Sequence, residues 1–289
     1  MDPNQHDPFT AEPEPTNPEF APVIAEPWEP PFAPSVPPDL QVPWGAGELF
    51  LFLAFFLLLA VGVAPLSVSL GMMGLHISHA FVPHTPRETS IFLLANQLEL
   101  SAGIMLYLYL RLRLRYHAPF WKTLQWRALA PVNAPVALAY AACVGGGCTL
   151  ALTVGVISER LGKGAPMPIE EFFQSHDTAL ALMLMSVFLA PLVEETIFRG
   201  FLYPVLARRA GVFMGVVLTG ALFGLMHSYQ LGGNKGHVAL LILVGMVLTA
   251  VRAVSRSVLA SFLVHISYNS FLAAGYLLSN TFHQLPLHH

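Results

Sequence analysis

The sequence predicts an all-α fold, a polytopic membrane bundle of about seven to eight transmembrane helices. Of its 289 residues, 55% are hydrophobic and only 11% are charged, whereas soluble domains carry roughly 25% charged residues. It also contains several long apolar runs, two of them without a single charge, and about 20 such residues are needed to cross a bilayer as a helix. The lipid bilayer is therefore an expected partner. A nucleic acid is not an expected partner, since a surface that binds nucleic acid requires clustered Lys and Arg on one face.

The first 45 residues differ from the rest of the chain. They hold 13 of the 24 prolines and eight of the 17 acidic residues, and no Lys or Arg. Proline removes a backbone donor and fixes φ, so this composition favours an extended, solvated segment. We expect residues 1–45 to form an acidic, Pro-rich, disordered cytoplasmic tail. A docking segment for a Pro-binding module is the alternative. Without a basic n-region the segment is not a secretory signal peptide.

Hydrophobic runs place seven spans after this tail. The expected spans cover residues 49–70, 91–110, 134–157, 178–193, 212–226, 238–251 and 258–278. An eighth is expected only if one region splits or a re-entrant piece exists. We divide the chain into N-terminal transmembrane helices (46–177), a catalytic transmembrane core (178–279) and a short C-terminal tail (280–289).

The distribution of Lys and Arg between loops predicts the orientation, because cytoplasmic loops carry an excess of positive charge. With a cytoplasmic N-terminus, four such residues lie outside, namely Arg87, Arg160, Lys163 and Lys235. Nine lie inside: Arg111, Arg113, Arg115, Lys122, Arg127, Arg208, Arg209, Arg252 and Arg256. We therefore expect a multi-pass protein of the cytoplasmic membrane with its N-terminus inside and its C-terminus outside.

The stretch FLAPLVEETIFRGFL places charges where an apolar span ends. A charge at the bilayer centre costs about 2.5–3.5 kcal/mol on insertion scales, so it needs a partner or a wet cavity. Glu195 and Arg199 are four residues apart and can pair along one helix. Glu194 points about 100° away from Glu195 and needs a partner from another span, for which His227 is the best candidate. Pro191 should bend the helix just before the two acids.

Two later spans carry further polar residues. The sequence FGLMH places Phe223 and His227 one turn apart, and HISYN places His265 and Asn269 on one helix face. A Glu and a His can activate water as a general base, while the other His and the Asn can donate to an oxyanion. The same four side chains can instead hold a divalent metal such as zinc. Spacing alone leaves both chemistries open.

These residues resemble the CPBP family of intramembrane proteases, which includes type II CAAX prenyl endopeptidases and bacteriocin-processing relatives. The family pattern EExxxR, FxxxH and HxxxN or HxxxD is read here, in order, across residues 178–279. The resemblance implies that Glu194 and His227 activate water, that His265 and Asn269 form the oxyanion site, and that Glu195 and Arg199 support the first helix. The family was long described as metalloproteases and is now more often regarded as glutamate-dependent. We favour the glutamate mechanism with no cofactor. If a metal is required, its expected ligands are Glu194, His227, His265 and Asn269.

The leading hypothesis is therefore an intramembrane endopeptidase acting on a peptide or protein substrate in or near the membrane. One alternative is a catalytically silent membrane scaffold or a bacteriocin-immunity-like binding protein. Another is a transporter with a midplane proton relay, for which the sequence shows no inverted repeat. Glu99, an acid inside the second expected span, is interpreted as a partner for a neighbouring helix rather than as part of the site.

Overall fold

A computed structural model describes residues 36–131, 133–161 and 176–284, and this part of the chain contains helices and no strands. Within it, six helical segments are long and apolar enough to cross a membrane: Ala46–Gly74, Pro86–Arg115, Val136–Leu161, Leu180–Ala210, Lys235–Ser255 and Val258–Leu278. The remaining expected span is the shorter apolar helix Val212–Met226. The predicted polytopic helical bundle is confirmed.

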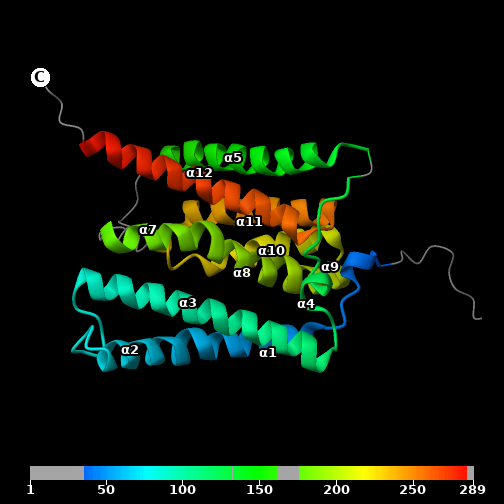
Figure 1. Ribbon diagram of the computed structural model, residues 1–289. Coiled ribbons are helices and arrows are strands. Elements are labelled where there is room, and N and C mark those ends of the chain that lie inside the picture. The colour runs from blue at the N-terminus through cyan, green and yellow to red at the C-terminus, as the bar shows by residue number, and fades with distance from the viewer. Residues whose placement is uncertain (1–35, 132, 162–175, 285–289) are drawn as a thin grey trace, which may run out of the picture. The chain divides into compact units, whose positions relative to one another are not determined.

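The N-terminal helices form a pair at one side of the bundle (Figure 1). Helix α1 (Ala46–Leu57) passes through a π-helical turn, η3 (Leu58–Val63), into α2 (Ala64–Gly74), which packs against α3 (Pro86–Leu110). The sequence sets where α3 begins, because the Thr85 side chain accepts a hydrogen bond from the Glu88 backbone N–H and Pro86 stands in the first turn. A π-helical turn, η4 (Arg111–Arg115), and the short helix α4 (Phe120–Thr123) follow. Glu99 accepts a hydrogen bond from Ser67 of α2, as its interpretation as an interhelical partner requires.

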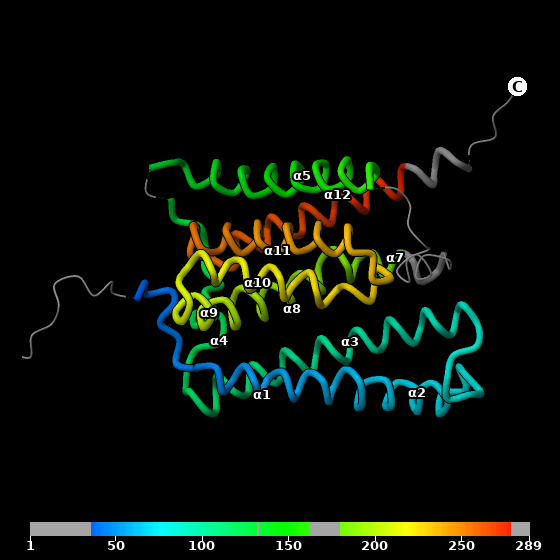
Figure 2. The backbone as a smooth tube through the Cα atoms, turned by 180° about the vertical axis from the view of Figure 1, so that it is seen from behind, coloured from blue at the N-terminus to red at the C-terminus, as the bar shows by residue number. Residues whose placement is uncertain are grey.

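The other helices pack in a series that both views show (Figures 1 and 2). Helix α5 (Val136–Leu161) lies along α12 (Val258–Gln284), which contacts α11 (Lys235–Ser255), and α11 lies along α10 (Val212–Met226). A side-chain cap from Asn234 begins α11. Helix α12 continues five residues into the predicted C-terminal tail, as far as Gln284.

The sequence predicted that the fourth span ends at residue 193, before its acidic pair. In the structure the helix continues through that pair. It runs from α7 (His176–Leu184) through η5 (Met185–Leu189), α8 (Ala190–Glu195) and η6 (Thr196–Leu202) to α9 (Tyr203–Ala210). The expected end at residue 193 was wrong because the charged side chains are paired inside the fold. Pro191 stands at the start of α8, directly after the π-helical turn η5. Proline has no backbone N–H, and the wider π-helical turn accommodates the missing hydrogen bond.

The last ten residues of the predicted tail are also folded against the helices, which corrects that boundary; residues 1–35 lie outside the described part. A 3₁₀ turn, η2 (Pro38–Leu40), buries Asp39, whose carboxylate lies 2.8 Å from the guanidinium of Arg252. Trp44 is buried, stacks on Phe201 and donates its indole N–H to the Phe201 carbonyl at 3.0 Å. Arg208 donates to the carbonyl oxygens of residues 42 and 44. Composition predicted a solvated segment because it does not reveal these specific partners.

Arg252 therefore does not belong among the loop cations that were counted for the orientation. Its side chain is fully buried, and it faces both Asp39 and the ring of Tyr203. The cytoplasmic position of the N-terminus stays a prediction.

Glycines let four helices approach closely around the C-terminal half of the bundle. A Cβ on Gly220 or Gly224 of α10 would overlap the backbone and side chains of α11 at Met246 and Ile242. A Cβ on Gly147 of α5 would overlap the carbonyl oxygen of Val264 on α12. Small residues at such contacts are the usual means of close helix packing in membranes. The positions of α11 and α12 therefore depend on these contacts.

We predict that Gly147→Ala destabilises the protein by about 1–3 kcal/mol, the usual cost of overpacking, because α5 and α12 must separate. Gly146→Ala is the matched control, since a Cβ there meets nothing within 4 Å. Thermal unfolding in detergent micelles measures the difference. Equal melting temperatures for the two variants would contradict the close approach.

We also predict that Asp39→Asn destabilises the protein by about 3–5 kcal/mol, because it leaves the buried charge of Arg252 without an acidic partner. Glu48→Gln breaks the corresponding pair with Arg111, whose side chain is 30% exposed, so a cost of about 0–1 kcal/mol is expected. Chemical unfolding of the two variants in the same detergent provides the comparison. Similar losses would show that the Asp39 contact is not buried in the folded protein.

Candidate active site

A fully buried ion pair forms the support of the candidate site. The guanidinium of Arg199 lies 2.9 Å from Oε1 of Glu195, four residues earlier on the same helix, and both side chains are 0% exposed. The spacing-based prediction of this pair is confirmed. Arg199 also donates to the Gly245 carbonyl at 2.8 Å and to the Thr249 hydroxyl at 3.2 Å, both on α11. Its cation lies 4.7 Å from the centroid of the Phe223 ring on α10. One arginine thus joins three helices.

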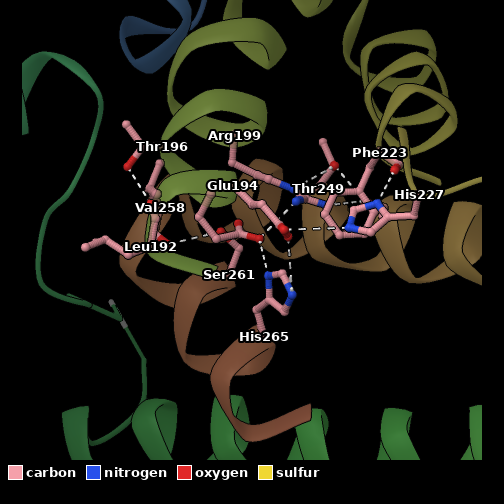
Figure 3. Close-up of polar contacts among 12 residues, drawn as sticks. Leu192, Glu194, Thr196, Arg199, Phe223, His227, Thr249, Val258, Ser261 and His265 are labelled. Atoms are coloured by element: carbon pink, nitrogen blue, oxygen red, sulfur yellow. Dashed lines mark hydrogen bonds and ion pairs between the residues drawn. The ribbon is translucent and has the colours of Figure 1, made fainter. Parts of the chain in front are cut away.

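The neighbouring acid, Glu194, faces two histidines from other helices (Figure 3). Its Oε1 lies 3.6 Å from Nε2 of His227, which caps the C-terminal end of α10. Its Oε2 lies 3.8 Å from Nε2 of His265, in α12. The side chain of Glu194 is 23% exposed. The structure therefore brings together three of the four predicted catalytic residues, from segments that lie far apart in the sequence.

The second nitrogen of each histidine is already engaged. Nδ1 of His227 lies 2.7 Å from the Phe223 carbonyl oxygen, which can only accept, so this nitrogen carries a proton. Nδ1 of His265 lies 2.9 Å from the Glu195 carboxylate oxygen that also accepts from Arg199, so it donates as well. In each neutral ring Nε2 is then a lone-pair acceptor that faces Glu194. A carboxylate and two nitrogen lone pairs repel one another unless a shared proton or a bridging donor, such as water, lies between them.

The contact between His265 and Glu195 did not follow from helix spacing. The resemblance implied that Glu195 supports its own helix, but the structure places it against both Arg199 and His265. The other carboxylate oxygen of Glu195, Oε2, is buried without a hydrogen-bond partner. Glu195 consequently fixes the ring orientation and the tautomer of a histidine on α12, as an outer carboxylate does for many functional histidines.

Asn269 lies one turn beyond His265 but is directed to another partner. Its side-chain N–H donates to the carbonyl oxygen of Ser186 at 2.7 Å, within the π-helical turn η5. An amide group has two N–H donors, so one remains for another acceptor. Asn269 therefore tethers α12 to the turn that precedes Pro191.

The metal alternative stays a hypothesis that rests on the residue types of the site. Among the residues that the structure describes, no group of three or more His, Cys, Asp or Glu side chains is placed to hold a metal ion. Asn269, the fourth expected ligand, bonds the backbone at Ser186.

Two supporting residues were missed from the sequence. Thr249 and Gly245 contact Arg199 from α11, which carries no part of the three-part motif. Thr249 is a small polar residue in an apolar helix and its hydroxyl can satisfy itself on the carbonyl four residues earlier, as it does at 2.7 Å. No sequence signal separates it from an ordinary helical threonine.

Comparison with known proteins finds a family that is similar to the segment that holds this site. Residues 176–271 match the family described as Type II CAAX prenyl endopeptidase Rce1-like. The matched segment contains Glu194, Glu195, Arg199, His227, His265 and Asn269, and also Thr249 and Gly245.

One curated relative of the chain is an uncharacterised 24.3 kDa protein of Escherichia coli, which is 34% identical over 128 residues. The alignment covers 41% of this chain and 57% of that protein, so the chain spans little more than half the length of this relative. No solved structure matches the chain. The Rce1-like segment and the apolar helices together identify a multi-pass membrane protein.

We predict that Thr249→Val weakens the site, because the Nε donor of the buried Arg199 loses its acceptor. An unsatisfied buried donor costs about 1–3 kcal/mol. Thr153→Val is the matched control, since Thr153 makes the same hydrogen bond to the carbonyl four residues earlier but lies on an exposed face of α5. Unfolding measurements on both variants test the assignment. A loss as large for Thr153→Val would show that removal of the intrahelical bond, and not the contact with Arg199, matters.

Proposed function

We propose that this protein is an intramembrane endopeptidase that hydrolyses a peptide bond with a water molecule activated by Glu194 and His227. The observation that carries the proposal is the convergence of two imidazole Nε2 atoms on the carboxylate of Glu194, at 3.6 and 3.8 Å. These separations exceed a direct hydrogen bond of about 2.7–3.2 Å and suit a bridging water. The Rce1-like match of the same segment agrees with peptide-bond hydrolysis.

In the first step Glu194 accepts a proton from water while the water oxygen forms a bond to the carbonyl carbon of the substrate. The lone pair of His227 Nε2 faces the same water and can hold the proton in turn, because its Nδ1 is fixed on the Phe223 carbonyl. The carbonyl π electrons move to the oxygen and give a tetrahedral intermediate. When the intermediate collapses, the C–N bond breaks and the proton passes to the leaving amine.

His265 is proposed to stabilise the oxyanion of that intermediate. Donation from Nε2 requires its imidazolium form, since Nδ1 already donates to Glu195. The carboxylate of Glu195, 2.9 Å away, accepts from this cation and holds its ring in place. The second N–H of Asn269 is the other proposed donor, while the first keeps α12 attached to Ser186. Preorganised donors of this kind usually contribute the largest share of such catalysis.

Glu195 and Arg199 are proposed as positioning residues, because neither side chain is exposed to a substrate. The substrate is proposed to be a peptide or protein in or near the bilayer. This class follows from the position of the site among membrane-spanning helices and from the family match.

We predict that Glu194→Gln lowers cleavage by at least about 100-fold, the lower end of the contribution of a positioned general base. Purified wild-type and variant proteins in micelles are compared on a membrane-inserted peptide library. Glu99→Gln is the matched control, because Glu99 is also an acid within a membrane-length helix but is held by Ser67 of α2 and not by a residue of the site. Cleavage by the control variant should persist.

Retained cleavage in the Glu194 variant would overturn the proposal, and the absence of cleavage in the wild type would favour the silent scaffold. Metal analysis of the same preparations, with and without a chelator, addresses the remaining alternative. Activity that is lost on chelation and restored by zinc alone would replace the glutamate mechanism with the metal-dependent one.

A further inference from the structure

We propose that the end of α3 carries a binding site for the headgroup of an anionic phospholipid, separate from the candidate active site. A groove of about 430 Å³ lies there, lined by Tyr109, Leu110, Arg113, Leu114 and His117. Its volume falls within the range of about 300–1,000 Å³ that is typical of small-molecule sites. The groove combines two nitrogen-bearing side chains with apolar ones, as a phosphate joined to an acyl chain requires.

The length of the helix places this groove at headgroup depth. The continuous helical segment Pro86–Arg115 has 30 residues, which span about 45 Å at 1.5 Å per residue. The hydrocarbon core is only about 30 Å thick. The end that carries Arg113 and Arg115 therefore reaches the polar region, since arginines without acidic partners are costly to hold in hydrocarbon.

Exposed aromatic residues mark the same level. Tyr109 is 47% exposed and Trp121, in the short helix α4, is 49% exposed. The two segments are in contact, because the ring of Phe120 packs 5.8 Å from that of Tyr109. Tyr and Trp concentrate where the bilayer meets water. The groove thus opens between an aromatic level and the polar end of α3.

The charges around the groove favour an anionic ligand. Arg111 is neutralised by two hydrogen bonds to Glu48. Within the described part of the chain, Arg113 makes no ion pair with an acid, and no acid lines the groove. Leu110 and Leu114 stay 41% and 69% exposed beside it. An unpaired guanidinium next to exposed leucines suits a lipid phosphate with its acyl chain along the helix, and an anionic lipid better than a zwitterionic one.

Native mass spectrometry of the full chain in micelles, with equal amounts of phosphatidylglycerol and phosphatidylcholine, tests the proposal. We expect preferential retention of one phosphatidylglycerol molecule. Arg113→Gln should lower the affinity about tenfold, the loss expected for one charge-assisted contact. Arg115→Gln removes the same charge two residues along, outside the groove lining, and should retain the lipid. Unchanged melting temperatures without added lipid show that both variants fold.

Three results would overturn the proposal. Equal retention of both lipids would show that the site does not recognise the charge of the headgroup. Equal losses for the variants at positions 113 and 115 would indicate a diffuse effect of net charge. Displacement of the lipid by inorganic phosphate at comparable concentration would show an anion site that needs no acyl chain. None of these outcomes depends on cleavage by the candidate active site.

Discussion

The arrangement of the C-terminal helices depends on the hydrogen bonds made by the buried guanidinium of Arg199. A cation without solvent exposure in a membrane bundle needs several acceptors, and these come from Glu195 on its own helix and from Gly245 and Thr249 on α11. The Phe223 ring of α10 lies beside it. Because Glu195 also accepts from His265 on α12, the same network fixes the fourth helix.

Close packing supplies the distances that this network requires. The glycines at 220 and 224 let α10 lie against α11, and Gly147 lets α5 lie against α12. Trp44 stacks on Phe201, two residues beyond Arg199, and Asp39 holds Arg252, three residues beyond Thr249. The segment before the first span therefore clamps the two helices that bind the arginine. A loss of packing at these contacts would misplace Glu194 and His265 although neither is touched directly.

The two proposed sites use charge in opposite ways. At Glu194 the polar atoms converge in a partly exposed place within the helices, where protons can be moved between fixed groups. At Arg113 an exposed cation lies at the end of a long helix beside apolar side chains, where it can only bind. The first arrangement suits chemistry on a peptide bond. The second suits attachment to the membrane surface, which would hold the bundle at a defined depth.

The sequence by itself determined the helical membrane fold, the approximate spans and the pairing of Glu195 with Arg199, because hydrophobic length and i, i+4 spacing are local properties of a helix. It also pointed to Glu194, His227 and His265 as a group. Only the tertiary structure decided that Glu195 orients His265, that Asn269 binds the carbonyl of Ser186, and that Asp39 and Trp44 are buried. Those contacts join residues up to 213 positions apart. They follow from how closely the helices approach one another, and no local pattern in the chain encodes that approach.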